Sequence, residues 1–392
     1  MRTSNGSQLL KINLDYYDGH KSLLATGAYK ALGTAKKVKD FQKHGSIPLS
    51  DFLNYFLIRR HENPGYATYL DRLNHIDKAS MWLEDVLDIS STINWRPGSK
   101  REQEGVGEAV SLSVANALFG LTAADWTTIP EQKGRNAHPT FDFEQTLVGI
   151  TPQNSIVQIE AKGSFVLNNT LSSPAVKSHA RNIAKKKTDI ASKGAAYKHP
   201  AMAMYGMIAA IDPMNEAKCW LLDPPVDLLE GNPRDIKVAT RLEYVASIVS
   251  MLAPNAKLPR ALQERAKLWR EGAVSKQVES LEGHPFTGEN YVEAYLAKSK
   301  IIMKEQDIVG QIYEAESGRI FFLGLRGDLV RAAIKQDPEA IINARFLPSE
   351  EQAELVAKPM LLSRWKKGSP RKVSIRLYTA SSGVVIGLPS EG

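Results

Sequence analysis

Residues 140–164 alternate between apolar and polar side chains, and this alternation predicts two β-strands joined by a polar turn. The turn falls at residues 151–154, Thr-Pro-Gln-Asn, a composition typical of chain reversals. Successive side chains of a strand point to opposite faces of the sheet. The second strand therefore has an apolar face with Val157, Ile159 and Ala161, and a polar face with Gln158, Glu160 and Lys162.

The first strand of this pair carries acidic side chains opposite two aromatic rings. Phe141 and Phe143 flank Asp142, so Asp142 and Glu144 share the face away from the rings. Folding the chain at the turn brings Asp142 within a few positions of Glu160. We therefore expect two carboxylates and one lysine to project from the same face of the sheet.

Apolar residues at three-and-four spacing predict helices around this strand pair. Before it, we expect helices at residues 51–58, capped by Ser50, at 66–87, and at 105–121, the last following a Pro-Gly loop at 95–101. Residues 125–139 are polar and predict an exposed loop. After the pair, we expect a helix at 174–193 and strands at 203–211 and 218–222. This order of elements predicts a mixed central sheet flanked by helices.

Beyond Pro225 the pattern changes to longer helices and a second set of strands. Helices are expected at residues 241–252, 258–269, 291–304 and from 327 to just before 338, with strands at 308–314, 319–325, 373–378 and 384–388. We therefore predict an α/β protein, α+β overall. Its expected parts are a mainly helical N-terminal region (1–95), a central core (96–225) and an α+β C-terminal domain (226–392).

Charge is concentrated in two segments of a chain whose formal net charge is +7. The first is the predicted helix at 174–193, where Arg181, Lys185 and Lys186 can contact phosphates. The second is the acid-free run at 364–376, where Trp365 can stack on a base beside basic residues; ordinary surface charge is the alternative. Its candidate nucleic-acid contacts are Arg364, Trp365, Lys366, Lys367 and Arg371.

Composition excludes several classes of protein. The chain has 392 residues, of which 43% are hydrophobic and 24% charged, as in ordinary globular proteins. No run of 18 apolar residues and no hydrophobic signal core occurs, so we expect a cytoplasmic protein without a membrane partner. The single cysteine, Cys219, excludes an internal disulfide and is expected to be a small core residue. No glycine-rich phosphate loop followed by lysine is present, which argues against an ATP-driven motor.

The predicted cluster of Asp142, Glu160 and Lys162 has a specific chemical use. Two adjacent carboxylates repel each other and raise each other's pKa, and a divalent cation between them removes that repulsion. Oxygen ligands of this kind suit Mg²⁺ or Mn²⁺. A lysine on the same face can orient a metal-bound water or stabilise charge on a phosphate. These residues predict metal-assisted hydrolysis of phosphodiester bonds.

Asp142, the tripeptide Glu160-Ala161-Lys162 on the next strand and a preceding helix that carries Glu108 together resemble the PD-(D/E)XK nuclease superfamily, which has the restriction-endonuclease-like fold. The resemblance covers residues 100–225. It implies that Glu108, Asp142 and Glu160 hold one or two Mg²⁺ or Mn²⁺ ions, with the Ala161 carbonyl as a further ligand, and that Lys162 assists the attacking water.

The sequence departs from the superfamily pattern in two places. Phe141 rather than proline precedes Asp142, and Glu144 can replace Asp142 as the ligand. Glu108 also has a purely structural interpretation, because an acidic residue near the start of a helix is stabilised by the helix dipole.

We expect a magnesium-dependent endonuclease that acts on DNA, with RNA left open, in restriction, defence, recombination or repair. Its extra regions would supply target recognition or a surface for a homodimer or another protein. The alternative is a nucleic-acid-binding or scaffold subunit that keeps the fold without catalysis. A hydrolase that uses Asp142 and Glu160 as an acid and base pair without metal is less favoured, because it has no use for Lys162.

Overall fold

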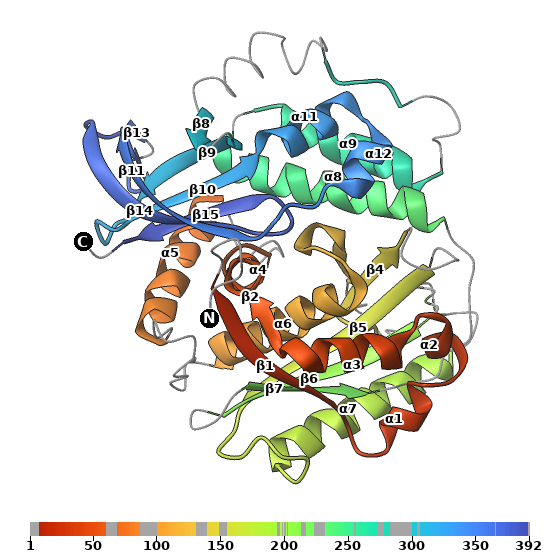
Figure 1. Ribbon diagram of the computed structural model, residues 1–392. Helices are drawn as coiled ribbons and strands as arrows, with labels where there is room; N and C mark the ends of the chain where they lie inside the picture. Colours follow the sequence, from red (N-terminus) through yellow and green to blue (C-terminus); the bar gives the residue numbers. More distant parts are fainter. Residues whose placement is uncertain are drawn as a thin grey trace. The chain divides into compact units, whose positions relative to one another are not determined.

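Figure 1 shows the protein in a computed structural model. The structure describes residues 8–59, 69–86, 100–130, 139–148, 155–193, 197, 199, 201, 203–212, 217–222, 232–254, 256–272, 278–282, 300–303, 306–364 and 366–390. The chain divides into two compact units, each built from separate stretches of sequence. Unit 1 comprises residues 1–8, 48–84 and 235–392, and unit 2 comprises residues 9–47 and 85–234. The N-terminal region predicted at 1–95 is therefore divided between the two units.

Within the described residues, unit 2 is built on a mixed seven-stranded sheet with the order β2-β1-β7-β6-β5-β4-β3. Its strands are β1 (Leu9–Tyr16), β2 (Ser46–Pro48), β3 (Trp126–Thr128), β4 (Phe143–Leu147), β5 (Ser155–Phe165), β6 (Ala203–Ile211) and β7 (Ala217–Leu222). β5 pairs in parallel with β6, and β1 with β7, whereas β4–β5 and β6–β7 are antiparallel. Every residue of β6 is buried, which explains its unbroken apolar sequence.

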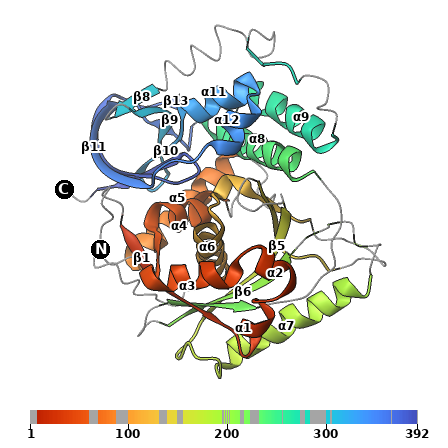
Figure 2. The same ribbon diagram turned by 45° about the vertical axis from the view of Figure 1, so that its right-hand side comes forward.

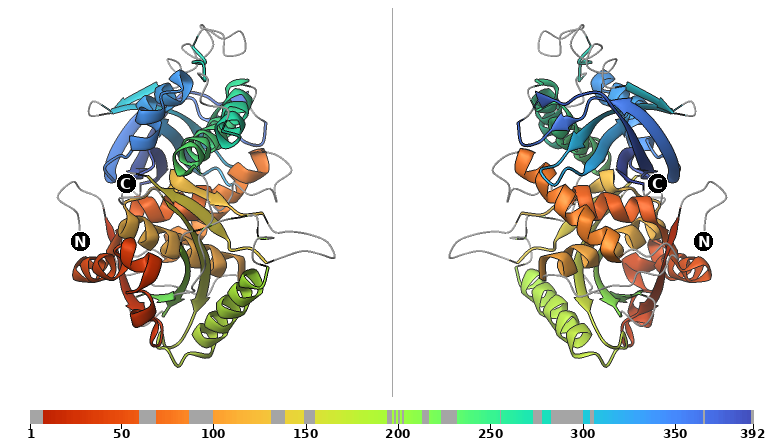
Figure 3. Two further views of the ribbon diagram at one scale, coloured as in Figure 1. Left: turned by 90° about the vertical axis from the view of Figure 1, so that its right-hand side faces the viewer. Right: turned by 90° about the vertical axis from the view of Figure 1, so that its left-hand side faces the viewer.

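Helices cover both faces of this sheet (Figure 3). They are α1 (His20–Leu23), α2 (Gly27–Ala31), α3 (Thr34–His44), α6 (Lys100–Phe119), the 3₁₀ turn Ala123–Asp125 and α7 (Pro174–Ala191). α6 packs on β5 through two glycines, since a Cβ built on Gly107 would lie 2.1 Å from the Cα of Gly163. α7 covers the opposite face, because a Cβ on Gly206 of β6 would lie 2.8 Å from Cγ2 of Ile183. Gly206 pairs with Glu160, so the polar face of β5 is the face beneath α7.

Unit 2 confirms most of the elements predicted for the core, with three differences. The N-terminal region contains the strand β1, whose pairing with β7 places it inside the sheet. The loop expected at 125–139 begins with the strand β3, which pairs with β4. α6 begins at Lys100, inside the loop predicted at 95–101. The predicted turn at 151–154 lies outside the described residues.

Unit 1 carries a second sheet, whose described strands follow the order β11-β14-β15-β10-β9-β12-β13, with β8 paired to β9. The strands are β8 (Lys300–Met303), β9 (Gln306–Glu314), β10 (Ile320–Arg326), β11 (Ser349–Ala357), β12 (Met360–Leu361), β13 (Lys366–Lys367), β14 (Arg371–Thr379) and β15 (Val384–Pro389). The helices are α4 (Leu49–Leu53), the π-helix Asn54–Ile58, α5 (Tyr69–Val86), α8 (Pro233–Leu252), α9 (Leu258–Arg270), α11 (Gly327–Lys335) and α12 (Pro338–Asn343). Figure 2 shows this sheet curling beside α8, α9, α11 and α12.

Unit 1 departs from the sequence prediction at three points. The end of the helix predicted at 291–304 is wrong, because Lys300–Met303 forms β8 on the edge of β9. β11 was not predicted, because its sequence is mostly polar and Ala353 is its one buried residue. Ser50 lies inside α4, whose N-cap is Pro48 and carries no side-chain cap.

The protein is α+β overall, with mixed sheets flanked by helices, as the hydrophobic pattern predicted. Among the described residues, no helix combines the length and apolar character needed to cross a membrane. Cys219 is fully buried, and burial raises the pKa of its thiol to about 12, in keeping with the predicted core role.

Candidate active site

Asp142 and Glu160 face each other across the start of β4. The first paired residues of the two strands are Phe143 and Ile159, so Asp142, one residue before β4, lies opposite Glu160. The backbone N–H of Ala161 donates a hydrogen bond of 3.1 Å to Oδ2 of Asp142. This bond holds the aspartate against β5, at the position predicted from the alternating pattern.

Lys162 lies between the two carboxylates. It follows Glu160 by two residues on β5, so the two side chains share one face of the strand. Its Nζ is 2.7 Å from Oε1 of Glu160 and 3.2 Å from Oδ2 of Asp142. The three residues that carried the sequence-based hypothesis therefore form one hydrogen-bonded group.

Lys186 joins the same group from α7. Its Nζ lies 2.6 Å from Oε2 and 2.7 Å from Oε1 of Glu160, and 3.4 Å from Oδ1 of Asp142. The segment between the parallel strands β5 and β6 contains α7, which crosses back over the polar face of β5. The sequence predicted Lys186 as a phosphate contact on the helix surface, whereas the structure brings it into the carboxylate cluster.

The buried stripe of α7 could have indicated this position. Its buried residues are Val176, Ala180, Ile183, Lys187 and Ile190. Lys186 borders that stripe three residues after Ile183 and four before Ile190, so a helical projection turns it toward the sheet. Three consecutive lysines at 185–187 cannot share one helix face, and Lys186 is the one that contacts Glu160.

Burial and charge together determine the protonation of the cluster. Glu160 is 1% exposed, and burial, followed by the nearby charge of Asp142, raises its pKa to about 7. The ammonium groups of Lys162 and Lys186 act in the opposite direction on that pKa. Burial alone would lower the pKa of Lys162, but the two carboxylates raise it above its ordinary value. Lys162 is therefore an ammonium ion at neutral pH.

The cluster is open to solvent on one side. The side chains of Asp142, Lys162 and Lys186 keep 27%, 30% and 24% of their exposure, whereas Glu160 keeps only 2%. A group that enters from solvent therefore meets the aspartate and the two lysines first. Glu160 forms the floor of the site.

The other acidic candidates lie at different places. Glu144 pairs in register with Gln158 rather than Glu160, and its Oε2 lies 3.9 Å from Nδ1 of His199. Asp142, and not Glu144, is thus the β4-side acid that contacts the lysines. Glu108 lies on α6, one residue after the glycine that packs on the opposite face of β5, and is half-buried.

The candidate metal ligands are carboxylate oxygens, which suit a hard cation, but two side chains, Asp142 and Glu160, supply them. Oxygen atoms of Asp142 and Glu160 converge from adjacent strands, as Mg²⁺ or Mn²⁺ requires. No group of three or more His, Cys, Asp or Glu side chains that could hold a metal occurs in the part of the chain that the structure describes. The roles of Glu108 and of the Ala161 carbonyl as further ligands therefore stay predictions.

Two histidine contacts near the cluster were not predicted. Ser164 Oγ lies 2.7 Å from Nε2 of His179, which is two turns before Lys186 on the same face of α7. Burial and the charge of Lys162 lower the pKa of His179. On β5, Gln158 donates to the His199 carbonyl at 2.7 Å and accepts from the Tyr197 hydroxyl at 3.0 Å. These contacts fix the two ends of the polar face around Glu160 and Lys162.

The predicted nucleic-acid contacts fall into two groups. On α7, Arg181 and Lys185 are exposed. In unit 1, Arg364, Lys366 and Lys367 are exposed, but Arg371 pairs with Glu314. Trp365 lies outside the described residues.

Comparisons with models of protein families, with curated proteins and with solved structures found no match to this chain. The geometry of the cluster is therefore what indicates a function. That geometry provides a carboxylate pair, a bridging lysine and a second lysine on the sheet face beneath α7, with one side open to solvent.

Proposed function

We propose that the protein is a metal-dependent nuclease that hydrolyses phosphodiester bonds of DNA, with a unit 2 of the PD-(D/E)XK type. The observation that carries the proposal is the position of Lys162, whose Nζ contacts both Asp142 and Glu160 from adjacent strands. If the sequence resemblance is real, these three residues must lie close together in space. Residues of a chance match need not lie close together.

Each side chain has a defined task in this proposal. Asp142 and Glu160 would hold Mg²⁺ or Mn²⁺, which when bound supplies a Lewis acid and lowers the pKa of a coordinated water. Lys162 would orient the attacking water or stabilise the charge that grows on the phosphate. Lys186 offsets the repulsion between the carboxylates and so favours the ionised form of Glu160, the form that binds a cation.

The proposed substrate is DNA, and RNA is a second possibility. Arg181 and Lys185 present positive charge on the exposed side of α7, the helix that also supplies Lys186. Phosphates on that surface would reach the open side of the cluster. We propose a role in restriction, defence, recombination or repair, with a homodimer or a partner protein for double-strand cleavage.

The test is incubation of the purified protein with supercoiled plasmid and with single-stranded DNA in the presence of Mg²⁺, Mn²⁺ or a chelator. Lys162→Ala and Asp142→Ala should abolish cleavage while circular dichroism and thermal unfolding stay close to wild type. Lys30→Ala, an exposed lysine on α2 of the same unit, is the matched control and should cleave normally. Metal-dependent cleavage that persists in both cluster variants would refute the assignment.

A catalytically silent nucleic-acid-binding or scaffold subunit is the second candidate. It is favoured by the mutual neutralisation of the cluster, in which two ammonium groups already contact both carboxylates. Such a protein would bind DNA with strong salt dependence, without divalent metal and without producing nicks. A gel shift on the samples from the cleavage assay separates it from the nuclease.

A further inference from the structure

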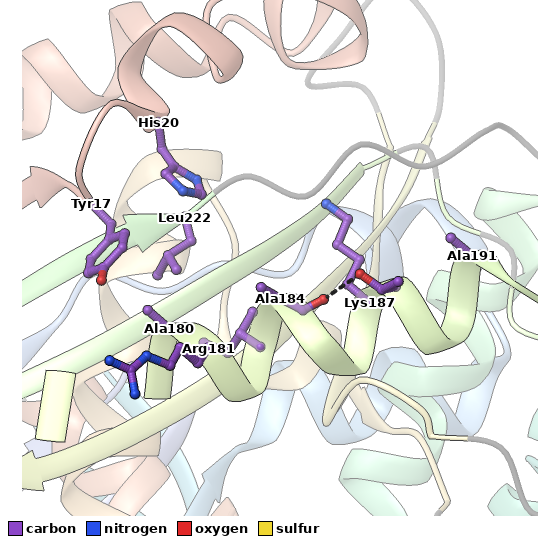
Figure 4. Close-up of a pocket in the computed structure, with 10 residues that line it drawn as sticks. Tyr17, His20, Ala180, Arg181, Ala184, Lys187, Ala191 and Leu222 are labelled. Carbon is purple, nitrogen blue, oxygen red and sulfur yellow. Dashed lines mark hydrogen bonds between the residues drawn. The ribbon is translucent and has the colours of Figure 1, made fainter. Parts of the chain in front are cut away.

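A cavity of about 480 Å³ lies beside α7 (Figure 4). Its walls come from α7, from Tyr17 and His20 in the segment that follows β1, and from Leu222 at the end of β7. All of these residues belong to unit 2. The volume is in the range of pockets that hold a small organic ligand, which is about 300–1,000 Å³.

The cavity is separate from the carboxylate cluster but shares its face of the sheet. Glu160 pairs with Gly206 of β6, and Gly206 pairs with Leu222 of β7. Two strand spacings separate Glu160 from Leu222, which is roughly 10 Å. Ile183 of α7 fills the space above Gly206, between the two sites. The helix therefore presents Lys186 to the cluster and a different stripe of side chains to the cavity.

Positive charge and an apolar floor coexist in the cavity. Arg181 and Lys187 both line it, six residues apart on α7, which corresponds to roughly 9 Å along the helix. Figure 4 shows the two side chains extending toward opposite ends of the cavity. Lys187 is 6% exposed. The described residues that line the cavity include no aspartate or glutamate, so they favour an anion.

The remaining walls suit a flat ring. Tyr17 and His20 pack edge to face with ring centroids 5.6 Å apart and lie across the cavity from α7. The alanines of α7 lie opposite them, and Ile183 and Leu222 add to the apolar lining. An anionic end and a planar apolar body are the two halves of a nucleotide. We propose that this cavity binds a nucleoside phosphate, with the phosphate on Lys187 or Arg181 and the base beside Tyr17 and His20.

This ligand can reach the protein from two sources, a free nucleotide or the terminal nucleotide of a DNA strand. Both present the same chemistry to the cavity. The proposal concerns binding and is independent of cleavage at the carboxylate cluster, so the experiment is done in chelator, where the proposed nuclease is inactive.

The test is isothermal titration calorimetry of the full chain with dAMP, deoxyadenosine and inorganic phosphate in separate titrations. We expect dAMP to bind at least about tenfold more tightly than either half alone, because it engages the cations and the rings together. Equal affinity for dAMP and inorganic phosphate would overturn the proposal. Absence of binding by both dAMP and a 5′-phosphorylated oligonucleotide would also overturn it.

Two variants locate the binding. Lys187→Met keeps the buried methylene chain and removes the charge, and Arg181→Gln changes an exposed residue, so both should fold. The variant that removes the cation in contact with the phosphate should weaken binding of dAMP about tenfold. Lys177→Gln, on an exposed position of the same helix outside the cavity, should bind as wild type. Unchanged affinity in both cavity variants, with thermal unfolding confirming their fold, would refute the site.

Competition by oligonucleotides identifies the source. A short single strand with a 5′-phosphate that displaces dAMP, where its 5′-hydroxyl counterpart does not, indicates that the cavity holds a strand end. Binding of dAMP that neither oligonucleotide displaces indicates a free nucleotide. Displacement of dAMP by both strands with equal strength, unaffected by Lys187→Met, would show that the ligand lies elsewhere and would refute the site.

Discussion

Each unit of the protein contains a cluster of buried polar side chains, and the two clusters are built differently. In unit 1, Oδ1 of Asp51 accepts hydrogen bonds of 2.7 Å from both the backbone N–H and the hydroxyl of Ser381. Nearby, Asn54 donates to Tyr244 at 2.9 Å and to Ser382 at 2.8 Å. Apart from Asp51, these are neutral groups, and all of them are buried.

The cluster in unit 2 combines four charged side chains, three of which keep about a quarter or more of their exposure. Burial raises the pKa of Asp51 and of Glu160 alike, so a shifted pKa alone does not separate the two clusters. Solvent access and the number of charged side chains do separate them. A cluster with a purely structural role needs neither solvent access nor several charged side chains, whereas a site that binds a charged substrate needs both.

The largest expected difference is in activity. Lys186→Met removes the ammonium group that contacts both carboxylates, and the cleavage rate should fall about 10²-fold or more, as when one electrostatic donor is removed from an active site. Tyr244→Phe in unit 1 should cleave at the wild-type rate per folded molecule. The measurement is the initial rate of plasmid nicking at saturating Mg²⁺. Equal losses in both variants would mean that stability, and not chemistry, limits the assay.

For stability we expect the larger effect in unit 1, and not in unit 2. Asp51→Ala leaves the buried N–H and hydroxyl of Ser381 without their acceptor and should lower the free energy of unfolding by about 2–3 kcal/mol. Lys186→Met leaves Lys162 in contact with both carboxylates and should lower the free energy of unfolding by less than Asp51→Ala does, about 1 kcal/mol. Urea unfolding, followed by circular dichroism, measures both. A larger loss for Lys186→Met would indicate that the unit 2 cluster is mainly structural.

The pH dependence of stability offers a third comparison, in metal-free protein. The pKa of Glu160 is about 7 in the folded state, above its ordinary value of 4.5, so the folded state binds the proton more tightly. Protonated Glu160 therefore adds to the free energy of unfolding at low pH. This contribution should decrease by about 2 kcal/mol between pH 5 and pH 7. The difference in unfolding free energy between wild type and Glu160→Gln should follow that decrease. A difference that stays constant over this range would contradict the raised pKa.

The smallest effects are expected for the two basic surfaces. Lys372 pairs with Glu354 at 2.5 Å, both side chains being more than 60% exposed, so its charge is already offset. Lys185→Gln should reduce the salt slope of DNA binding by about one, and Lys372→Gln should change it by less. Fluorescence anisotropy at several salt concentrations gives both slopes. A larger change for Lys372→Gln would assign the DNA contact to unit 1.

The central strands and their three candidate residues could be predicted because the information is local. Alternation with a period of two placed Glu160 and Lys162 on one face, and a turn between two strands placed Asp142 opposite them. The apolar run of β6 and the helix α7 were equally clear. Each of these predictions depends on neighbours within about 20 residues.

The missed features depend on contacts between distant segments. β1 shows alternation, with Leu10, Ile12 and Leu14 buried, but its partner β7 lies about 200 residues later in the chain. The spacing of α7 turns Lys186 toward the sheet, but the strand residues that it meets depend on how α7 crosses the sheet, which no spacing in the sequence specifies. The cavity beside Lys187 depends on the same crossing and on β1.

The placement of β1 determines which fragments of the chain can be studied alone. A fragment limited to the predicted core at 96–225 would lack β1, and β7 would become the edge of the sheet, with unpaired backbone along Ala217–Leu221. Such an edge invites aggregation, and the loss of Tyr17 and His20 would open the cavity as well. A fragment that keeps β7 paired should therefore join residues 9–47 to residues 100–234 through a linker.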